Sequence, residues 1–169
     1  TLSLHDALPI CWIDSVVDEV VTFRPGEGLV RYAGADIAWF YRGSNIPPRE
    51  IILEATFALT PGDERAVKLA MENMLARRKA AQPLERPSCG SVFRNPPEQK
   101  ASHLVETCGL KGYTVGGAQV SEKHANFIVN TGRATAADVT KVIVHVMNEV
   151  RGRHGVELRP EVKFLGFPA

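Results

Sequence analysis

The strongest hydrophobic pattern in the chain lies between residues 135 and 150. Apolar residues recur there every three or four positions, which predicts a helix with one continuous apolar stripe. The stripe consists of Val139, Val142, Ile143, Val146, Met147 and Val150. Thr135 and Asp138 have the spacing of a capping box at its start. Weaker patterns of the same kind predict helices over residues 64–80 and 101–108, the second ended by Gly109.

Other segments alternate between apolar and polar residues, as strands do. Residues 51–59 place Ile51, Leu53, Ala55, Phe57 and Leu59 on one face, which predicts a half-buried strand. Residues 156–164 alternate similarly, and Pro160 places that strand at a sheet edge or a bulge. Residues 12–23 predict one or two strands before a turn at 24–28, and residues 126–130 predict a short strand. Helices and strands follow without a regular βαβ order, so the predicted fold class is α+β.

Charge and cysteine content exclude several classes of protein. The 169 residues carry 20 Lys and Arg against 19 Asp and Glu, a net charge of +1 that gives no overall attraction to nucleic acid or to an anionic membrane. No apolar run approaches the roughly 20 residues of a membrane span. Cys11, Cys89 and Cys108 fit neither a metal site nor a disulfide framework, which favours reduced thiols in the cytosol.

Three residues are candidates for catalysis, each with a simpler structural interpretation. Ser91 lies in "PSCGSVFRNPP", where it is a turn residue or a proton donor. Arg42 follows three aromatic residues, as a surface arginine or as a partly desolvated clamp for a carboxylate. Glu161 lies between basic residues and is expected to be solvated. Taken singly, each residue favours the structural interpretation.

The polar residues around these positions are candidates for ligand binding. Lys111 and Gly112, with the Gly116–Gly117 pair, could hold a phosphate through backbone N–H groups and one ammonium. Asn95 and His124 are polar ligands or structural residues with equal weight. None of these signals is specific by itself.

Four motifs occurring in one order are specific. They are "FYRGS", "PSCGSVFRNP", "GLKGYTVGGAQVSEKHANFIVN" and "LRPEVKFLG". Together they resemble the UDP-N-acetylenolpyruvoylglucosamine reductase (MurB) family over residues 12–166. The family's usual forms are close to Y-R-x-S, G-S-x-F-K-N-P and E-P-E-V. Arg94 replaces the usual Lys and Arg159 the usual Glu, beside the expected catalytic residues but not at them.

The resemblance implies an oxidoreductase of peptidoglycan precursor synthesis in the cytoplasm, monomeric when complete. It implies that hydride passes from NADPH through FAD to C3 of UDP-N-acetylglucosamine enolpyruvate. Arg42, Ser91 and Glu161 match the family's catalytic positions, and Ser91 matches its proton donor. The positions expected to contact the UDP-sugar are Tyr41, Asn95, Lys111 and His124.

The resemblance also implies how the chain is organised. Residues 12–60 correspond to the C-terminal part of a FAD-binding domain and residues 61–155 to an α+β substrate-binding domain, while 156–169 are a closing strand that carries Glu161. Residues 1–11 resemble foreign sequence. Because most flavin-binding residues are then expected outside this chain, we expect the chain alone to bind FAD poorly and to be inactive.

Two other functions are compatible with parts of the pattern. A non-enzymatic nucleotide-sugar-binding module shares Lys111 and Asn95 but needs no catalytic group. A small RNA-binding domain is disfavoured by the charge of +1 and by the lack of an exposed aromatic and basic sheet pattern.

Overall fold

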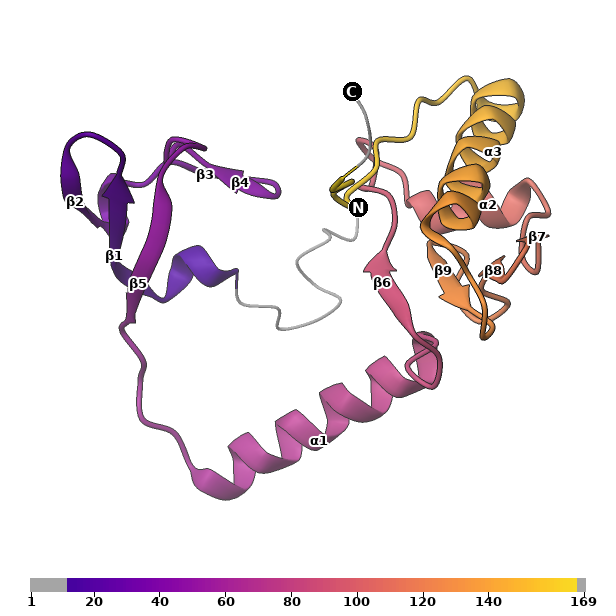
Figure 1. The fold of residues 1–169 in the computed structure, drawn as a ribbon. Helices are drawn as coiled ribbons and strands as arrows, with labels where there is room; N and C mark the ends of the chain where they lie inside the picture. Colours follow the sequence, from indigo (N-terminus) through magenta and orange to yellow (C-terminus); the bar gives the residue numbers. More distant parts are fainter. Residues whose placement is uncertain (1–11, 167–169) are drawn as a thin grey trace. The chain divides into compact units, whose positions relative to one another are not determined.

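The computed structural model describes residues 12–166, and its fold is α+β, as predicted. The predicted foreign segment 1–11 and residues 167–169 lie outside the described residues. The chain divides between Asp63 and Glu64 into two compact units, which are described separately here. Figure 1 labels the helices and strands of both units.

The first unit is built on a three-stranded antiparallel sheet with β1 at its centre. The strands are β1 (Val17–Arg24), β2 (Gly28–Ala33) and β5 (Ile51–Phe57), in the order β2-β1-β5. The predicted turn at 24–28 connects β1 and β2. A short hairpin of β3 (Trp39–Phe40) and β4 (Gly43–Ser44) follows, with 3-10 turns at Ile13–Ser15 and Gly34–Asp36.

Strand β5 forms where residues 51–59 predicted it, but the prediction of a half-buried face was wrong. All seven residues of β5 are exposed. β5 is an edge strand, paired on one side with β1, and its apolar faces receive no cover from the residues that the structure describes. The buried apolar residues of this unit, Val20, Val21 and Ile37, lie instead on β1 and just after the second 3-10 turn.

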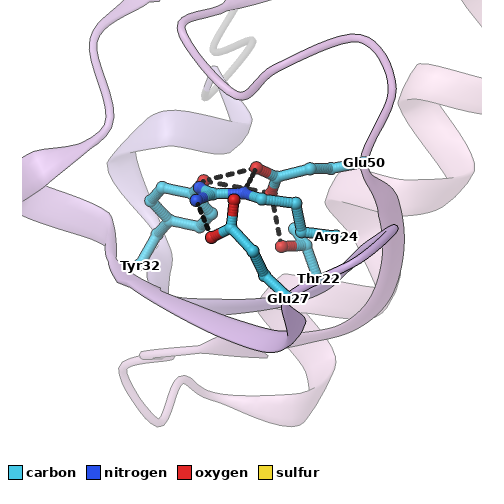
Figure 2. A network of polar contacts seen from close by, with 5 residues as sticks. All are labelled: Thr22, Arg24, Glu27, Tyr32 and Glu50. Atoms are coloured by element: carbon cyan, nitrogen blue, oxygen red, sulfur yellow. Dashed lines mark hydrogen bonds and ion pairs between the residues drawn. The ribbon is translucent and has the colours of Figure 1, made fainter.

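A polar network ties the first strand to the start of β5 (Figure 2). The Glu50 side chain is 1% exposed and accepts hydrogen bonds from Thr22 Oγ1 at 2.5 Å, Arg24 Nε at 2.7 Å and the Tyr32 hydroxyl at 3.0 Å. Burial raises the pKa of Glu50, but these three donors outweigh it and hold the pKa below its ordinary value. Arg24 also pairs with the exposed Glu27 at 2.7 Å. The buried carboxylate is therefore ionised and fully engaged.

The second unit carries the remaining elements. They are α1 (Glu64–Ala81), β6 (Ser88–Ser91), α2 (Ala101–Thr107), β7 (Thr114–Val115), β8 (Ala118–Val120), β9 (Phe127–Asn130) and α3 (Ala136–His154). The antiparallel sheet has the order β6-β9-β8-β7, α3 packs against β8 and β7, and α2 packs beside α3 (Figure 1). The three predicted helices and the short strand at 126–130 are confirmed.

Helix α3 supplies most of the helical part of the core. Its predicted capping box is present, with Thr135 Oγ1 accepting from the Asp138 N–H at 3.1 Å and Asp138 Oδ2 from the Thr135 N–H at 3.0 Å. Gly155 ends the helix with φ +67°. The predicted stripe faces the sheet: Val142, Ile143, Val146 and Val150 are buried, and Val139 and Met147 pack against them.

The prediction of a strand over residues 156–164 was wrong. The segment makes a single bridge to the other described residues, between Phe93 and Pro160. Pro160 has no N–H to donate, so pairing cannot continue through it as a regular ladder. Leu158, which is 1% exposed, anchors the segment in the core.

Candidate functional site

Ser91 is the last residue of β6, where that strand pairs with β9. Its register partner is Phe127, and the pairing shifts between Ser88 and Ser91. Gly90 lies inside this shift with φ +81°, a conformation that residues with a side chain rarely adopt. The glycine therefore sets the direction in which the chain presents Ser91, which is half-buried.

Glu161 lies beside this strand end. Its backbone N–H donates to the Val92 carbonyl at 2.7 Å, and the Arg94 N–H donates to the Arg159 carbonyl at 2.9 Å. These two bonds flank the Phe93–Pro160 bridge. The structure thus brings together two of the three predicted catalytic positions, Ser91 and Glu161, although 70 residues separate them in the sequence.

His124 and Lys111 share a second cluster in the same unit. Burial lowers the pKa of His124, and the neighbouring Lys111 ammonium lowers it further. Lys111 Nζ pairs with Glu106 Oε1 at 2.5 Å, and this hydrogen bond holds the pKa of Glu106 below its ordinary value. His124 Nδ1 accepts from the Asn126 N–H at 3.2 Å, which leaves the proton of a neutral ring on Nε2. The cluster presents an ammonium and a neutral imidazole.

Asn95 has a structural partner as well. Its side-chain oxygen accepts the Ala101 N–H at 3.0 Å, at the start of α2. The side chain therefore connects the loop that follows Ser91 to a helix whose residues Ala101, Leu104 and Val105 are buried. This contact fixes the end of the predicted catalytic loop.

The Gly116–Gly117 pair does not form the phosphate cradle that the sequence suggested. A Cβ at Gly116 would lie 2.6 Å from an Asp138 carboxylate oxygen, and a Cβ at Gly117 would collide with the backbone of Ala134. The Gly117 N–H donates to the Asp138 carboxylate. The two glycines allow the β7–β8 turn to pack against the start of α3, where a carboxylate repels a phosphate.

Arg42 and Tyr41 belong to the first unit, in the turn between β3 and β4. Arg42 has φ +63°, a left-handed conformation that typically costs a non-glycine residue about 1–2 kcal/mol. Its guanidinium carbon lies 5.4 Å from the centre of the Tyr41 ring, within the range of a cation–π contact. The tight turn presents both side chains at the end of a short hairpin.

Sequence reasoning missed the role of Asn126, which was assigned only to a strand. Its side-chain amide makes two hydrogen bonds to the backbone of Phe93 and is buried. The available signal was a polar residue directly before the apolar run Phe127–Val129 of a strand expected to be buried. A buried amide in that position needs partners for both of its ends.

The second unit matches the model of a known protein family. Residues 82–165 match the family model described as "UDP-N-acetylenolpyruvoylglucosamine reductase, C-terminal domain". This range contains Ser91, Glu161 and the Lys111–His124 cluster. These parts of the candidate site therefore lie inside the matched domain, while Tyr41 and Arg42 precede it.

Similar whole proteins extend the match over most of the chain. A UDP-N-acetylenolpyruvoylglucosamine reductase of Methylococcus capsulatus is 49% identical over 152 residues, 90% of this chain and 50% of that protein. One of Synechocystis is 43% identical over 160 residues, 92% of this chain and 50% of that protein. The crystal structure of the Thermus caldophilus enzyme matches with a TM-score of 0.75 and 33% identity, over 88% of this chain and 53% of that one.

The chain therefore belongs to the UDP-N-acetylenolpyruvoylglucosamine reductase family and corresponds to the C-terminal portion of its members. It spans about half the length of the curated relatives it matches. Among residues 12–166, no helix combines the length and the apolar character that a membrane span requires.

Proposed function

We propose that this chain supplies the substrate side of a reductase that converts UDP-N-acetylglucosamine enolpyruvate to UDP-N-acetylmuramate, with FAD and NADPH as cofactors. The observation that carries the proposal is the hydrogen bond from the Glu161 N–H to the Val92 carbonyl, which brings the backbone of Glu161 beside the residue that follows Ser91. The matched family model and the names of the relatives support the choice of reaction. In this proposal residues 12–60 belong to the flavin domain, 61–155 to the substrate domain, and 156–169 close the site.

The described residues alone do not fit a flavin. A flavin pyrophosphate needs consecutive backbone N–H groups that no side chain obstructs. The Gly116–Gly117 pair, the one pair of adjacent glycines in the sequence, is packed against Asp138 and Ala134. We therefore assign no residue of this chain to the cofactor. When bound in the longer protein, the flavin supplies the hydride, and the residues of this chain act on the substrate only.

Ser91 acts as the proton donor in this proposal. Hydride addition at C3 of the enolpyruvyl group breaks the C=C double bond and leaves the electron pair at C2, delocalised into the substrate carboxylate. The Ser91 hydroxyl gives its proton to C2, which completes the addition of two hydrogens, and the oxygen then regains a proton from water. A donor must meet one face of that carbon at about 3 Å, and the pairing of Ser91 with Phe127 at the end of β6 supports this role because it fixes the Ser91 backbone.

Arg42 and Glu161 complete the catalytic group. A guanidinium can bind the substrate carboxylate with two parallel hydrogen bonds and can stabilise the negative charge that it gains. Lysine cannot reproduce that planar fork. Glu161 orients or polarises the reacting end of the substrate. Because Ser91, Arg42 and Glu161 have different roles in this proposal, replacing each of them is expected to change the kinetics in a different way.

The UDP-sugar is assigned to four further residues. Lys111 offers an ammonium to a phosphate, and its ion pair with Glu106 fixes the position of that ammonium. His124, kept neutral by burial and by Lys111, offers an Nε2–H donor. Tyr41 and Asn95 are the other two proposed contacts.

The test uses a chimera in which residues 12–169 follow the N-terminal half of the Methylococcus capsulatus relative. We expect the purified chimera to bind FAD, to have this flavin reduced once by NADPH, and to turn over further NADPH only when the enolpyruvyl substrate is added, with one UDP-N-acetylmuramate formed per NADPH. A flavin-loaded chimera that reduces no substrate, or one that binds no flavin, would contradict the proposed function.

A further inference from the structure

The backbone of the three residues after Ser91 makes hydrogen bonds to two different neighbours. On one side, the Val92 carbonyl and the Arg94 N–H bond to the backbone of residues 159–161. The N–H and carbonyl of Phe93 have their hydrogen-bond partners on the opposite side, and Phe93 is only 2% exposed.

The side chain of Asn126 occupies that opposite side. The Phe93 N–H donates to Asn126 Oδ1 at 2.9 Å, and Asn126 Nδ2 donates to the Phe93 carbonyl at 2.9 Å. The Asn126 backbone carbonyl also accepts the Val92 N–H at 2.9 Å. The carboxamide thus takes the place of a peptide group in a neighbouring strand, just beyond the last β6–β9 pair, Ser91 with Phe127.

We propose that Asn126 is a positioning residue for the reaction, acting through Phe93 on both Ser91 and Glu161. The inference rests on the proposed function. Only an uncharged group with one acceptor and one donor on the same planar unit can satisfy both backbone groups of Phe93, and among side chains of this length only asparagine provides it. Because Val92 and Arg94 bond to residues 159–161, a shift of Phe93 moves the segment that directly follows Ser91 and also moves the bond between Val92 and Glu161.

The kinetic test is Asn126→Ala in the chimera. Displacement of reacting groups by about 1 Å costs on the order of 10²-fold in rate. We expect kcat for enolpyruvyl reduction to fall about 10²-fold, with KM for the UDP-sugar changed much less and the rate of flavin reduction by NADPH unchanged. Asn126→Asp keeps the acceptor but puts a carboxylate against the Phe93 carbonyl, so it is expected to lose a similar factor.

The matched control is Val150→Ala, which removes a fully buried side chain of α3 that belongs to the same core. Its melting temperature should fall, while its kcat stays within about twofold of the unaltered chimera. If Asn126→Ala lowers only the melting temperature and leaves kcat like the control, Asn126 is merely structural and the inference is wrong.

A second measurement does not depend on activity. We expect the Phe93 amide of the unaltered chimera to be strongly protected from hydrogen exchange, and the protection to fall in Asn126→Ala, or in Asn126→Asp if the alanine variant does not fold. Rapid exchange in the unaltered protein would overturn the inference. A chimera with a protected Phe93 amide but no reductase activity would contradict the proposed function, while the two hydrogen bonds between Asn126 and Phe93 would be confirmed.

Discussion

The backbone N–H of Glu161 donates to the carbonyl of Val92 at 2.7 Å, and this bond connects two motifs that lie far apart in the sequence. The Arg94–Arg159 bond repeats the connection on the other side of Pro160. The segment that carries Glu161 therefore keeps its place without being a strand of the sheet. A pair of backbone bonds and the buried Leu158 hold it, and Val156 and Val162 pack against the same core.

Leu158→Ala tests how the segment around Glu161 is anchored. Leu158 is 1% exposed in the core, and removal of such a side chain leaves a cavity that typically costs 2–5 kcal/mol. We expect the free energy of unfolding, measured by urea titration with far-ultraviolet circular dichroism, to fall by about that amount. Leu165→Ala, at a side chain that is 86% exposed, is the matched control and should change it by less than about 0.5 kcal/mol. Equal losses in both variants would show that the segment is not anchored by Leu158.

The lowered pKa of His124 predicts that the folded chain loses stability in mild acid. Its pKa is lowered in the fold by burial and by Lys111, so the unfolded chain binds more protons below its ordinary value of 6.5. The contribution of neutral His124 is present above that value and is lost as the pH falls through the lower folded pKa. We expect the unfolding free energy to decrease between pH 7 and pH 5, and to decrease less in His124→Gln.

His103→Gln, which removes an exposed histidine, is the control for that experiment. Should His124→Gln show the same decrease between pH 7 and pH 5 as the unaltered chain, while His103→Gln shows a smaller one, the assignment to His124 fails.

The lowered pKa of Glu50 predicts that the first unit loses stability at a pH below about 4.5. Its lowered pKa means that the stabilisation by the ionised carboxylate is present above about 4.5 and is lost as the pH falls through the folded value. Both tryptophans, Trp12 and Trp39, lie in this unit, so tryptophan fluorescence follows its unfolding alone. We expect Glu50→Gln to unfold in less urea at pH 7 and to respond less to acid, while Glu54→Gln on the exposed strand β5 behaves like the unaltered chain. A Glu50→Gln variant with unchanged urea and acid transitions would contradict the network.

Local patterns predicted the elements that depend on local chemistry. Helix α3 was predicted together with its capping box because both ends of that signal lie within one turn. The segment 156–164 was predicted as a strand because its alternation is real, but a strand also needs a partner with matching N–H groups. Pro160 has no N–H to donate and residues 92–94 belong to no strand, so the described residues show one bridge there, between Phe93 and Pro160.

Contacts between distant residues explain what sequence patterns could not give. The resemblance supplied Ser91 and Glu161, yet only the fold shows that Val92 connects their segments. Asn126 was missed because an asparagine before an apolar run can be a turn residue as easily as a buried clamp. The Gly116–Gly117 pair was wrongly predicted to hold a phosphate because its actual neighbour, Asp138, lies more than 20 residues further along the chain.

The central claim is that Ser91 donates the proton that completes enolpyruvyl reduction. Its direct test is Ser91→Ala in the chimera, measured by stopped-flow spectroscopy of the two half-reactions. Ser88→Ala, which removes an exposed hydroxyl from the same strand, is the matched control.

We expect NADPH to reduce the flavin of Ser91→Ala at the normal rate, whereas reoxidation by the enolpyruvyl substrate slows by about 10²–10⁴-fold. Ser88→Ala should keep both rates. Reoxidation of Ser91→Ala at the normal rate would contradict the claim, and a nucleotide-sugar-binding module would show neither half-reaction.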